Sequence, residues 1–236
     1  MLRKMLLALC SGALMVGLLA APTSGEGVAT VFDLNGIPGT QLDICIPGVG
    51  ETVSNLRYGR VAYASDVPAG TYRMQVRVAA TGTCKGRLLF ARDVTLEADK
   101  NYTLVYWRPA RTVKIRQFEN DVSLPSADVG SLTLRHTAKA GPIDAWVWQQ
   151  VKAAADDAPT FDDLRKGAGR APVTLVERQA LVEVFPASTT KAWSYEYAYW
   201  YAEAGRTYQA YLIGTERKNY RLALLVQPGV APLPTP

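Results

Sequence analysis

Apolar and polar residues alternate along most of the chain with a period of two. In residues 72–78, tyrosine, methionine and valine occupy the even positions, whereas arginine and glutamine occupy the odd ones. Such alternation is typical of a strand that is buried on one face and wet on the other. The pattern predicts five strands in the first half of the chain, at 28–34, 40–46, 72–78, 102–107 and 112–118. The chain is therefore expected to be all-β, with antiparallel sheets.

Short segments of the first half recur in the second half in the same order. The pairs are 55–59 (NLRYG) with 163–167 (DLRKG), 97–102 (EADKNY) with 203–208 (EAGRTY), and 42–44 (LDI) with 143–145 (IDA). The offsets of 108, 106 and 101 residues are nearly constant. Units of about 100 residues with short strands and frequent turns predict two tandem immunoglobulin-like antiparallel β-sandwich domains.

Glycine, proline and aspartate mark the predicted turns. Pro68 and Gly70 occupy positions that a type I turn favours. Asp99 aligns with Gly205 between the repeats. Because both residue types tolerate a positive φ, this position predicts a hairpin corner in the left-handed conformation.

The chain divides into five expected parts. These are a signal peptide at 1–25, one β-sandwich repeat at 26–120, a linker at 121–130, a second repeat at 131–227 and a flexible, proline-rich tail at 228–236. An insertion at 151–164 interrupts the second repeat. Within it, Lys152–Ala155 favours a helical turn, and Thr160 with Asp163 has the spacing of a helix cap.

The N-terminal segment has the layout of a secretory signal peptide. Arg3 and Lys4 precede an apolar run at 5–21 that ends in small residues. The alternative is a membrane anchor, but the run barely reaches the ~20 apolar residues that span a bilayer, and small residues interrupt it. Cys10 is expected to leave with the peptide. The mature protein is then secreted, periplasmic or held in the cell envelope, with no membrane span.

Charge and composition narrow the range of functions. The 236 residues include 26 Lys and Arg, 21 Asp and Glu and one His, and loss of Arg3 and Lys4 would lower the net charge from +5 to +3. Neither half has the strongly basic face that binding to nucleic acid requires. One His and three Cys cannot form a multi-histidine or a four-cysteine metal site. No cofactor and no metal is predicted.

Two cysteines remain in the mature chain, Cys45 and Cys84. In an oxidising compartment an isolated pair of cysteines favours a disulfide. The alternative is one buried thiol and one exposed thiol.

Several motifs of the first half resemble a known family. They are GIPG at 36–39, LDIC at 42–45, NLRYG at 55–59, VPAGTY at 67–72 and VTLEADKNYTL at 94–104. With them the chain resembles the bacterial secreted domain-of-unknown-function family 4397, above all its actinobacterial members. The resemblance is good over 28–118 and weaker over 131–226, where VPAGTY is absent. It implies tandem β-sandwich units and export, with no established activity and no catalytic residues.

Candidate chemistry is sparse. No nucleophile motif accompanies His136, so a surface or turn histidine is favoured over a catalytic base. Asp156, Asp157, Asp162 and Asp163 resemble an oxygen-rich calcium loop, but their spacing lacks the EF-hand motif and also fits a solvated insertion.

Two further aspartates, Asp43 and Asp144, occupy the same place in both repeats. A catalytic pair would require the two repeats to face each other across a site. A structural carboxylate that accepts backbone N–H groups is the favoured interpretation.

An aromatic segment, WSYEYAYWYA at 193–202, is the most distinctive feature. In a strand, Tyr195, Tyr197, Tyr199 and Tyr201 lie on one face. The repeat register assigns the opposite face, with Trp200, to the core. The tyrosines are then either an exposed binding face or packed between the repeats. An exposed row offers apolar rings with hydroxyl tips, which suits sugar or protein binding.

These features favour an exported, non-enzymatic β-sandwich module with a structural or binding role. The expected partner is an envelope glycan or protein, and the tyrosine row is the candidate binding face. The alternative is an accessory protein or enzyme of surface-polysaccharide modification, since the layout is similar to that of periplasmic accessory proteins of exopolysaccharide acetylation. Glycoside cleavage would need two positioned carboxylates, and no such pair accompanies the tyrosines.

Overall fold

The computed structural model describes residues 27–47, 50–80, 84–109, 111–149, 158–187 and 194–231. Within these ranges every regular element is a strand except a short 3-10 helix at Arg217–Asn219, so the all-β prediction is confirmed. The predicted signal peptide and the predicted helical turn at Lys152–Ala155 lie outside the described residues. None of the described segments forms a helix long and apolar enough to cross a membrane.

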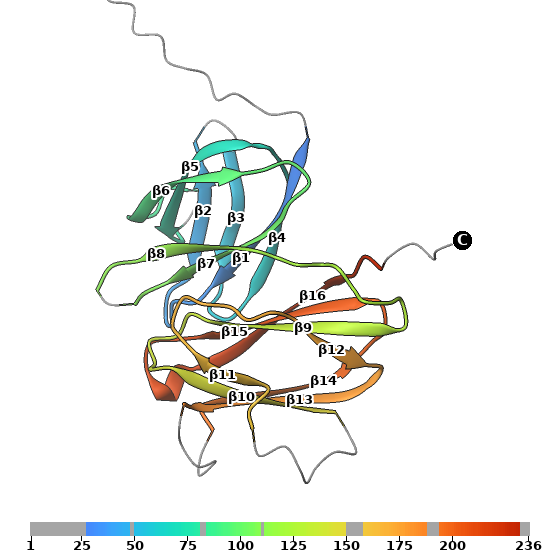
Figure 1. The fold of residues 1–236 in the computed structure, drawn as a ribbon. Helices are drawn as coiled ribbons and strands as arrows, with labels where there is room; N and C mark the ends of the chain where they lie inside the picture. The colour runs from blue at the N-terminus through green and yellow to red at the C-terminus, as the bar shows by residue number, and fades with distance from the viewer. Residues whose placement is uncertain are drawn as a thin grey trace, which may run out of the picture.

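The first half of the chain forms two four-stranded sheets (Figure 1). Its strands are β1 (Val28–Asn35), β2 (Leu42–Ile46), β3 (Gly50–Leu56), β4 (Val61–Pro68), β5 (Gly70–Val78), β6 (Leu88–Leu96), β7 (Asn101–Trp107) and β8 (Lys114–Glu119). One sheet has the order β4-β1-β7-β8 and the other the order β3-β2-β5-β6. Strands are present at all five ranges that the alternation predicted.

The second half forms two more four-stranded sheets. Its strands are β9 (Val129–His136), β10 (Ile143–Gln149), β11 (Phe161–Leu164), β12 (Val173–Val176), β13 (Arg178–Pro186), β14 (Glu196–Ala202), β15 (Arg206–Ile213) and β16 (Arg221–Pro228). The sheet orders are β12-β9-β15-β16 and β11-β10-β13-β14, which are those of the first half with every strand number raised by eight. In one respect the expectation was wrong: β1 pairs with β7 and β9 with β15 in parallel, so these sheets are mixed.

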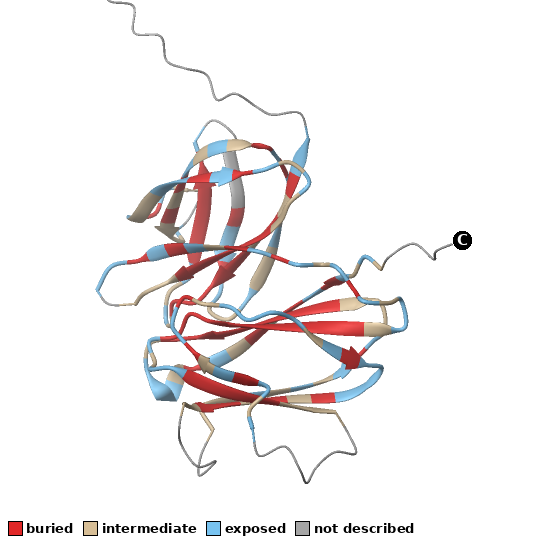
Figure 2. Cartoon of the chain, in the orientation of Figure 1, coloured by how far each residue is buried: buried red, intermediate tan, exposed pale blue. Residues whose placement is uncertain are grey.

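Each half buries an apolar core between its two sheets. Figure 2 shows the buried residues along the strands of both halves. In the first half, Val31 of β1 and Ile44 of β2 belong to one cluster. In the second half, Leu134 of β9 and Val182 of β13 belong to another. Alternation at the period of a strand therefore supplies both cores, as it does in a β-sandwich.

A third apolar cluster joins the two halves. Its buried members come from β1, β7 and β8 on one side and from β15 and β16 on the other: Leu34, Val105, Phe118, Tyr211, Ile213, Ala223 and Leu225. Figure 1 shows the sheet with β7 and β8 lying against the sheet with β9 and β15. The outer faces of two sheets thus become an interface.

Arg135 of β9 is buried in this interface, where it is 5% exposed. Its guanidinium donates hydrogen bonds to Asn120 Oδ1 at 2.7 Å and to the Glu119 carbonyl oxygen at 2.5 Å. The same group lies 4.7 Å from the centre of the Phe118 ring. A buried cation is stable only with such partners, so the segment before the expected linker is fixed to the second half.

Asp43 and Asp144 have the predicted structural role. Asp43 Oδ1 accepts a hydrogen bond from the backbone N–H of Asn55 at 3.0 Å, and Asp144 Oδ1 accepts one from that of Asp163 at 2.9 Å. Both donors have a positive φ, 51° for Asn55 and 44° for Asp163. The carboxylates therefore hold the same backbone distortion at the same place in each half.

The predicted left-handed conformation is confirmed at this corner, but the predicted hairpin is wrong, because β6 and β7, like β14 and β15, belong to different sheets. Asp99 has a φ of 60° and Gly205 a φ of 72°. Each lies in the short connection into the next strand, β7 or β15. Only residues that tolerate this conformation fit here, which explains the aspartate and the glycine.

The helix cap expected at Thr160 and Asp163 is wrong. Asp163 lies within strand β11, which pairs with β10. Thr160 Oγ1 accepts a hydrogen bond from the backbone N–H of Val147 at 3.0 Å. Pairing with the edge of β10 satisfies backbone groups that a helical turn would have satisfied internally, and this pairing is not visible in local spacing.

The beginning of the expected flexible tail is paired. Val230 donates a backbone hydrogen bond to Val122 at 2.7 Å, and its carbonyl accepts one from Leu124 at 2.9 Å. Linker and tail thus hold each other through a short parallel bridge. Residues 232–236 lie outside the described part of the chain.

Cys45 of β2 and Cys84, which precedes β6, form the expected disulfide, with Cα atoms 6.0 Å apart. The bond lies wholly within the first half. A disulfide of this kind is compatible with an extracellular or cell-envelope location.

Candidate functional site

Strand β14 presents three tyrosines to solvent. Tyr197, Tyr199 and Tyr201 are 63%, 60% and 56% exposed. Between them, Ala198 and Trp200 turn toward the second core, and Trp200 packs against it. The strand period of two therefore separates an aromatic outer face from an apolar inner face, and these three side chains are not packed between the halves.

The pairing of β14 with β13, and of β13 with β10, extends this aromatic surface onto two more strands. Residues directly opposite each other in an antiparallel pair share a face. Leu181 and Glu183 of β13 lie opposite Tyr199 and Tyr197. Trp148 and Trp146 of β10 lie in turn opposite Leu181 and Glu183. We call the resulting set the aromatic face: Trp146, Trp148, Leu181, Glu183, Tyr197, Tyr199 and Tyr201.

Contacts within the aromatic face hold its centre in place. Trp148 Nε1 donates a hydrogen bond to Glu183 Oε2 at 3.1 Å. Trp146 is 5% exposed and packs edge-to-face on Phe185, with ring centres 5.2 Å apart. The face thus has an ordered tryptophan side and an open tyrosine side. Its sheet lies on the side of the molecule away from the first half (Figure 1).

Tyr195, the fourth tyrosine of the predicted row, does not share this exposure. It precedes β14, and its ring packs edge-to-face on Tyr220 with centres 5.1 Å apart. Its backbone N–H donates to the Val184 carbonyl oxygen. The residue packs against the second core, where its burial stabilises the half.

The corresponding sheet of the first half has a polar outer face. There Arg73 of β5 lies opposite Asp93 of β6, and the two form an ion pair at 3.1 Å. Thr71 lies opposite Thr95, with the hydroxyl oxygens 3.0 Å apart. The same strand order is thus built without aromatic side chains at these positions, so the fold by itself does not require the tyrosines.

Among the described residues, the acidic groups of β13 and β14 do not form a facing pair. Glu183 lies opposite Tyr197, whereas Glu196 lies opposite Val184. Neighbouring positions of a strand point to opposite sides of the sheet. Glu183 therefore faces outward and Glu196 inward. Asp144 lies opposite Phe185 and so shares the face of Glu183, but it is buried and its Oδ1 accepts the backbone N–H of Asp163. These described acidic groups are therefore not two open carboxylates that flank a glycosidic bond.

The calcium loop, which the sequence left as an alternative to a solvated insertion, finds no support in the described residues. No group of three or more His, Cys, Asp or Glu side chains among them could hold a metal ion. Asp163 forms an ion pair with Arg165 at 3.5 Å, and Asp162 lies beside it in β11. Asp156 and Asp157 lie outside the described part of the chain.

The sequence favoured a surface or turn histidine at position 136, but His136 has a buried side chain. It ends β9, is fully buried, and its Nε2 lies 2.9 Å from the Gly141 carbonyl oxygen. Burial lowers its pKa to about 4. At the matching position of the first half, Asn35 donates from Nδ2 to the Thr40 carbonyl oxygen at 2.7 Å. Both side chains fasten the loop that follows the strand, so the role of His136 is structural.

Sequence reasoning missed the tryptophans and Glu183 as parts of the aromatic face. Residues 143–149 read IDAWVWQ, so the alternation alone places Trp146 and Trp148 on one side of a strand. Which strand lies next to which, and in what register, is a property of the sheet.

Comparisons with known proteins give one family and a distant structural likeness. The family described as Domain of unknown function (DUF4397) matches residues 29–146, which includes the first half from the second residue of β1, together with β9 and part of β10. No curated protein matches the chain. A crystal structure from Bacteroides ovatus ATCC 8483, for which a role in cell adhesion has been proposed, is 10% identical, with a TM-score of 0.25. The likeness covers 86% of this chain and 98% of that one.

Proposed function

The chain belongs to the family of domains of unknown function numbered 4397, and we propose that it acts as a non-catalytic glycan-binding module of the cell envelope. The observation that carries this proposal is the exposure of Tyr197, Tyr199 and Tyr201 in one row. Exposed large apolar groups in a contiguous set mark interaction sites more often than scattered single residues do.

The chemistry of the row suits a sugar chain. A tyrosine ring offers an apolar face that packs on the C–H face of a pyranose, and its hydroxyl can exchange hydrogen bonds with sugar hydroxyls. The tyrosines are two residues apart along the strand, which separates successive rings by about 7 Å. A linear glycan lying along β14 would contact successive rings with successive units.

The rest of the aromatic face supports binding of a glycan that lies along β14. Trp148 is held by Glu183, so its ring is fixed before a ligand arrives. A fixed aromatic group loses little conformational freedom on binding. Glu183 also supplies acceptor capacity for a sugar hydroxyl.

The test is the double variant Tyr197→Ser/Tyr199→Ser. Because both side chains are exposed, we expect its free energy of unfolding to stay within about 0.5 kcal/mol of the parent. Retention in affinity gels that contain neutral polysaccharides (β-glucan, xylan or mannan) should be lost in the variant and kept in the parent.

Tyr63→Ser is the matched control. Tyr63 lies on β4 in the first half and is 57% exposed, yet it is outside the aromatic face. Its loss should leave retention unchanged. The proposal fails if no neutral polysaccharide retains the parent, or if the double variant is retained like the parent. A fall of more than about 10 °C in the melting temperature would instead assign the tyrosines a structural role.

A further inference from the structure

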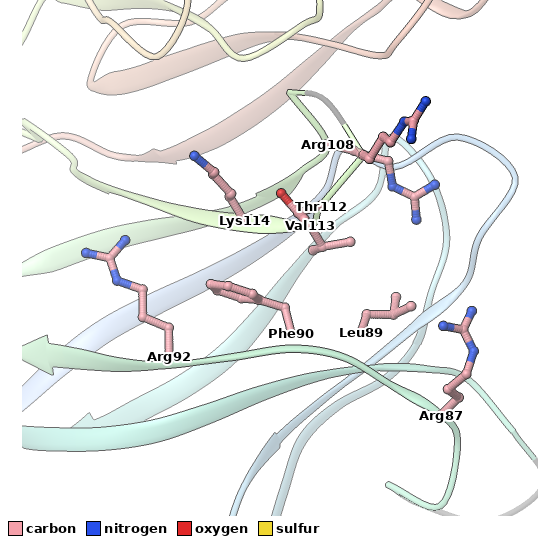
Figure 3. Close-up of a pocket in the computed structure, with 9 residues that line it drawn as sticks. Arg87, Leu89, Phe90, Arg92, Arg108, Thr112, Val113 and Lys114 are labelled. Carbon is pink, nitrogen blue, oxygen red and sulfur yellow. The ribbon is translucent and has the colours of Figure 1, made fainter.

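A cleft opens along one edge of the first half, where β6 of one sheet faces β8 of the other (Figure 3). Its volume is about 640 Å³, within the range of pockets that hold small ligands. Five of the side chains that line it are cations: Arg87, Arg92, Arg108, Arg111 and Lys114. They come from β6 and the residue before it, and from the β7–β8 hairpin, which follows β6 in the chain but belongs to the other sheet.

A β-bulge shapes the floor of this cleft. Val76 pairs with Phe90 and Arg77 with Leu88, so Leu89 is an extra residue in β6. A bulge re-aims a side chain, and Leu89 and Phe90 both pack at the border of the first core. Their exposed edges form an apolar floor between the cations (Figure 3).

The positive charge of the cleft is uncompensated. Its described lining includes no acidic residue, and none of the five cations forms an ion pair with a described residue. Arg108 Nε is buried and has no hydrogen-bond partner in the described part of the chain. Arg92 donates to the Ile115 carbonyl oxygen at 3.3 Å, which fixes it at the border between the two sheets. Like charges gathered in this way repel each other unless an anion binds between them.

Two tyrosines meet at the corresponding edge of the second half. There Tyr195, just before β14, packs on Tyr220, just before β16. Tyr220 belongs to the second core and Tyr195 packs against it. Aromatic side chains thus stand where the first half has its cationic cleft, so the strand order does not by itself dictate a cationic lining there.

We propose that this cationic cleft binds a segment of an acidic polysaccharide. Figure 3 shows Arg92 and Lys114 at one end and Arg87 and Arg108 at the other, with Phe90 and Leu89 between them. Arg87 and Arg92 are about 16 Å apart along an extended strand. A single small anion would reach only one end, whereas a carboxylated sugar chain offers several anions separated by apolar ring faces.

Side-chain chemistry supports this ligand. A guanidinium binds a carboxylate through two parallel hydrogen bonds, and the buried Nε–H of Arg108 has no acceptor among the described residues. The Phe90 ring suits the C–H face of a sugar. This site is independent of the aromatic face, which lies on the second half and carries no comparable charge.

The proposal is tested with oligomers of polygalacturonate, which carry one carboxylate per sugar, and with their methyl esters as the neutral match. Isothermal titration of the full chain should show binding of the acid that weakens as salt is raised. The ester should bind about tenfold more weakly or not at all. Arg87→Gln/Lys114→Gln, with one change at each end of the cleft, should weaken binding of the acid by about tenfold or more and keep the melting temperature.

Arg165→Gln/Lys218→Gln is the matched control, because it removes the same charge from side chains that are 80% and 83% exposed on the second half. It should change the affinity by less than about twofold. If the cleft double variant does not fold, Thr112→Glu adds a carboxylate to the cleft wall and should weaken binding in the same way.

Four results would overturn the proposal. These are no binding of the acid, equal binding of acid and ester, equal weakening by the control variant, and tighter binding of inorganic phosphate or a DNA oligonucleotide than of the acid. The last would assign the cleft to a phosphate ligand.

Discussion

Asp33 is a carboxyl group in the core of the first half. It is fully buried on β1, where Oδ1 accepts a hydrogen bond from the Tyr106 hydroxyl and Oδ2 has no partner in the described part of the chain. Burial raises its pKa from 3.8 to about 7, although the hydrogen bond from Tyr106 lowers it. At the matching positions the second half has two buried leucines, Leu134 and Leu212. The fold therefore does not depend on this carboxyl group.

The raised pKa of Asp33 predicts a pH-dependent loss of stability. Below about pH 4 the group is protonated in both folded and unfolded chains, but above that only the unfolded chain ionises, until the folded group also ionises near pH 7. Asp33→Asn keeps an acceptor for Tyr106 and removes the ionisation. Urea unfolding should show equal stability of variant and parent near pH 4 and a variant advantage of a few kcal/mol above pH 7. A constant difference across this range would contradict the prediction.

His136 predicts the opposite slope. Its pKa is lowered from 6.5 to about 4 by burial, so between these values the unfolded chain binds a proton that the folded chain does not. Stability is therefore lost as the pH falls from about 6.5 to 4, by roughly 3 kcal/mol. His136→Asn copies Asn35 of the first half and should remove this slope while the fold is kept. Urea unfolding that shows the same pH slope in variant and parent would refute the assignment.

At the scale of elements, edge strands β6 and β14 show how one framework carries two kinds of surface. Both border the sheet that faces away from the other half, and both alternate toward a core. β14 is regular and presents tyrosines outward. β6 has a bulge at Leu89 and turns its side chains toward an open cleft. The surfaces proposed for the two halves thus differ most at these edge strands, although β7 and β8 complete the cleft and β10 and β13 complete the aromatic face.

Strand positions were predictable because they depend on local alternation. Residues 72–78 lie within β5, and the repeated motifs marked the turns that Asp43 and Asp144 hold. Strand β11 was missed because its four residues are too few to alternate clearly, and Thr160 with Asp163 has the spacing of a helix cap. Only its pairing with β10 identifies it as a strand.

The cationic cleft could not be predicted from the same patterns. Arg87 and Arg92 are separated from Arg108 and Lys114 by a full strand and a turn, and they meet only after β6 and β8 reach the same edge of two sheets. The bulge at Leu89 depends on pairing with β5. The tyrosine row, in contrast, lies within one strand, so its shared face was visible in the sequence, and only its exposure required the sheet.

At the scale of the whole molecule, the contact between the halves combines apolar and polar groups. Asn101 Nδ2 donates to Gln227 Oε1 at 2.6 Å, and the Tyr58 hydroxyl donates to the Asn219 carbonyl oxygen. Together with the Arg135 contacts, these bonds fix the relative orientation of the two sheets, since each buried polar group needs its partner on the other side. The two proposed binding surfaces, in the cleft and on the aromatic face, therefore keep a fixed relation on the molecule.

We propose that the chain nevertheless divides into two folding units, at 26–120 and 131–227, joined by 121–130. The first core cluster contains residues of the first half alone, and the disulfide Cys45–Cys84 closes within it. A fragment of residues 26–120 should therefore unfold cooperatively. The fragment lacks the strands of the second half that cover Leu34, Val105 and Phe118. It should therefore have a lower melting temperature than the full chain and associate more readily.

Scanning calorimetry of the fragment and of the full chain measures the cooperativity and the melting temperature of each. The fragment is measured with and without a reducing agent. Removal of a native disulfide from a small domain costs about 2–5 kcal/mol, so the reduced fragment should melt at a lower temperature than the oxidised one. A broad, non-cooperative transition of the oxidised fragment would show that the cluster between the halves is part of a single core. In that case the first half would need Arg135 and its partners in order to fold. The two halves would then unfold as one cooperative unit, although each has its own pair of sheets with the same strand order.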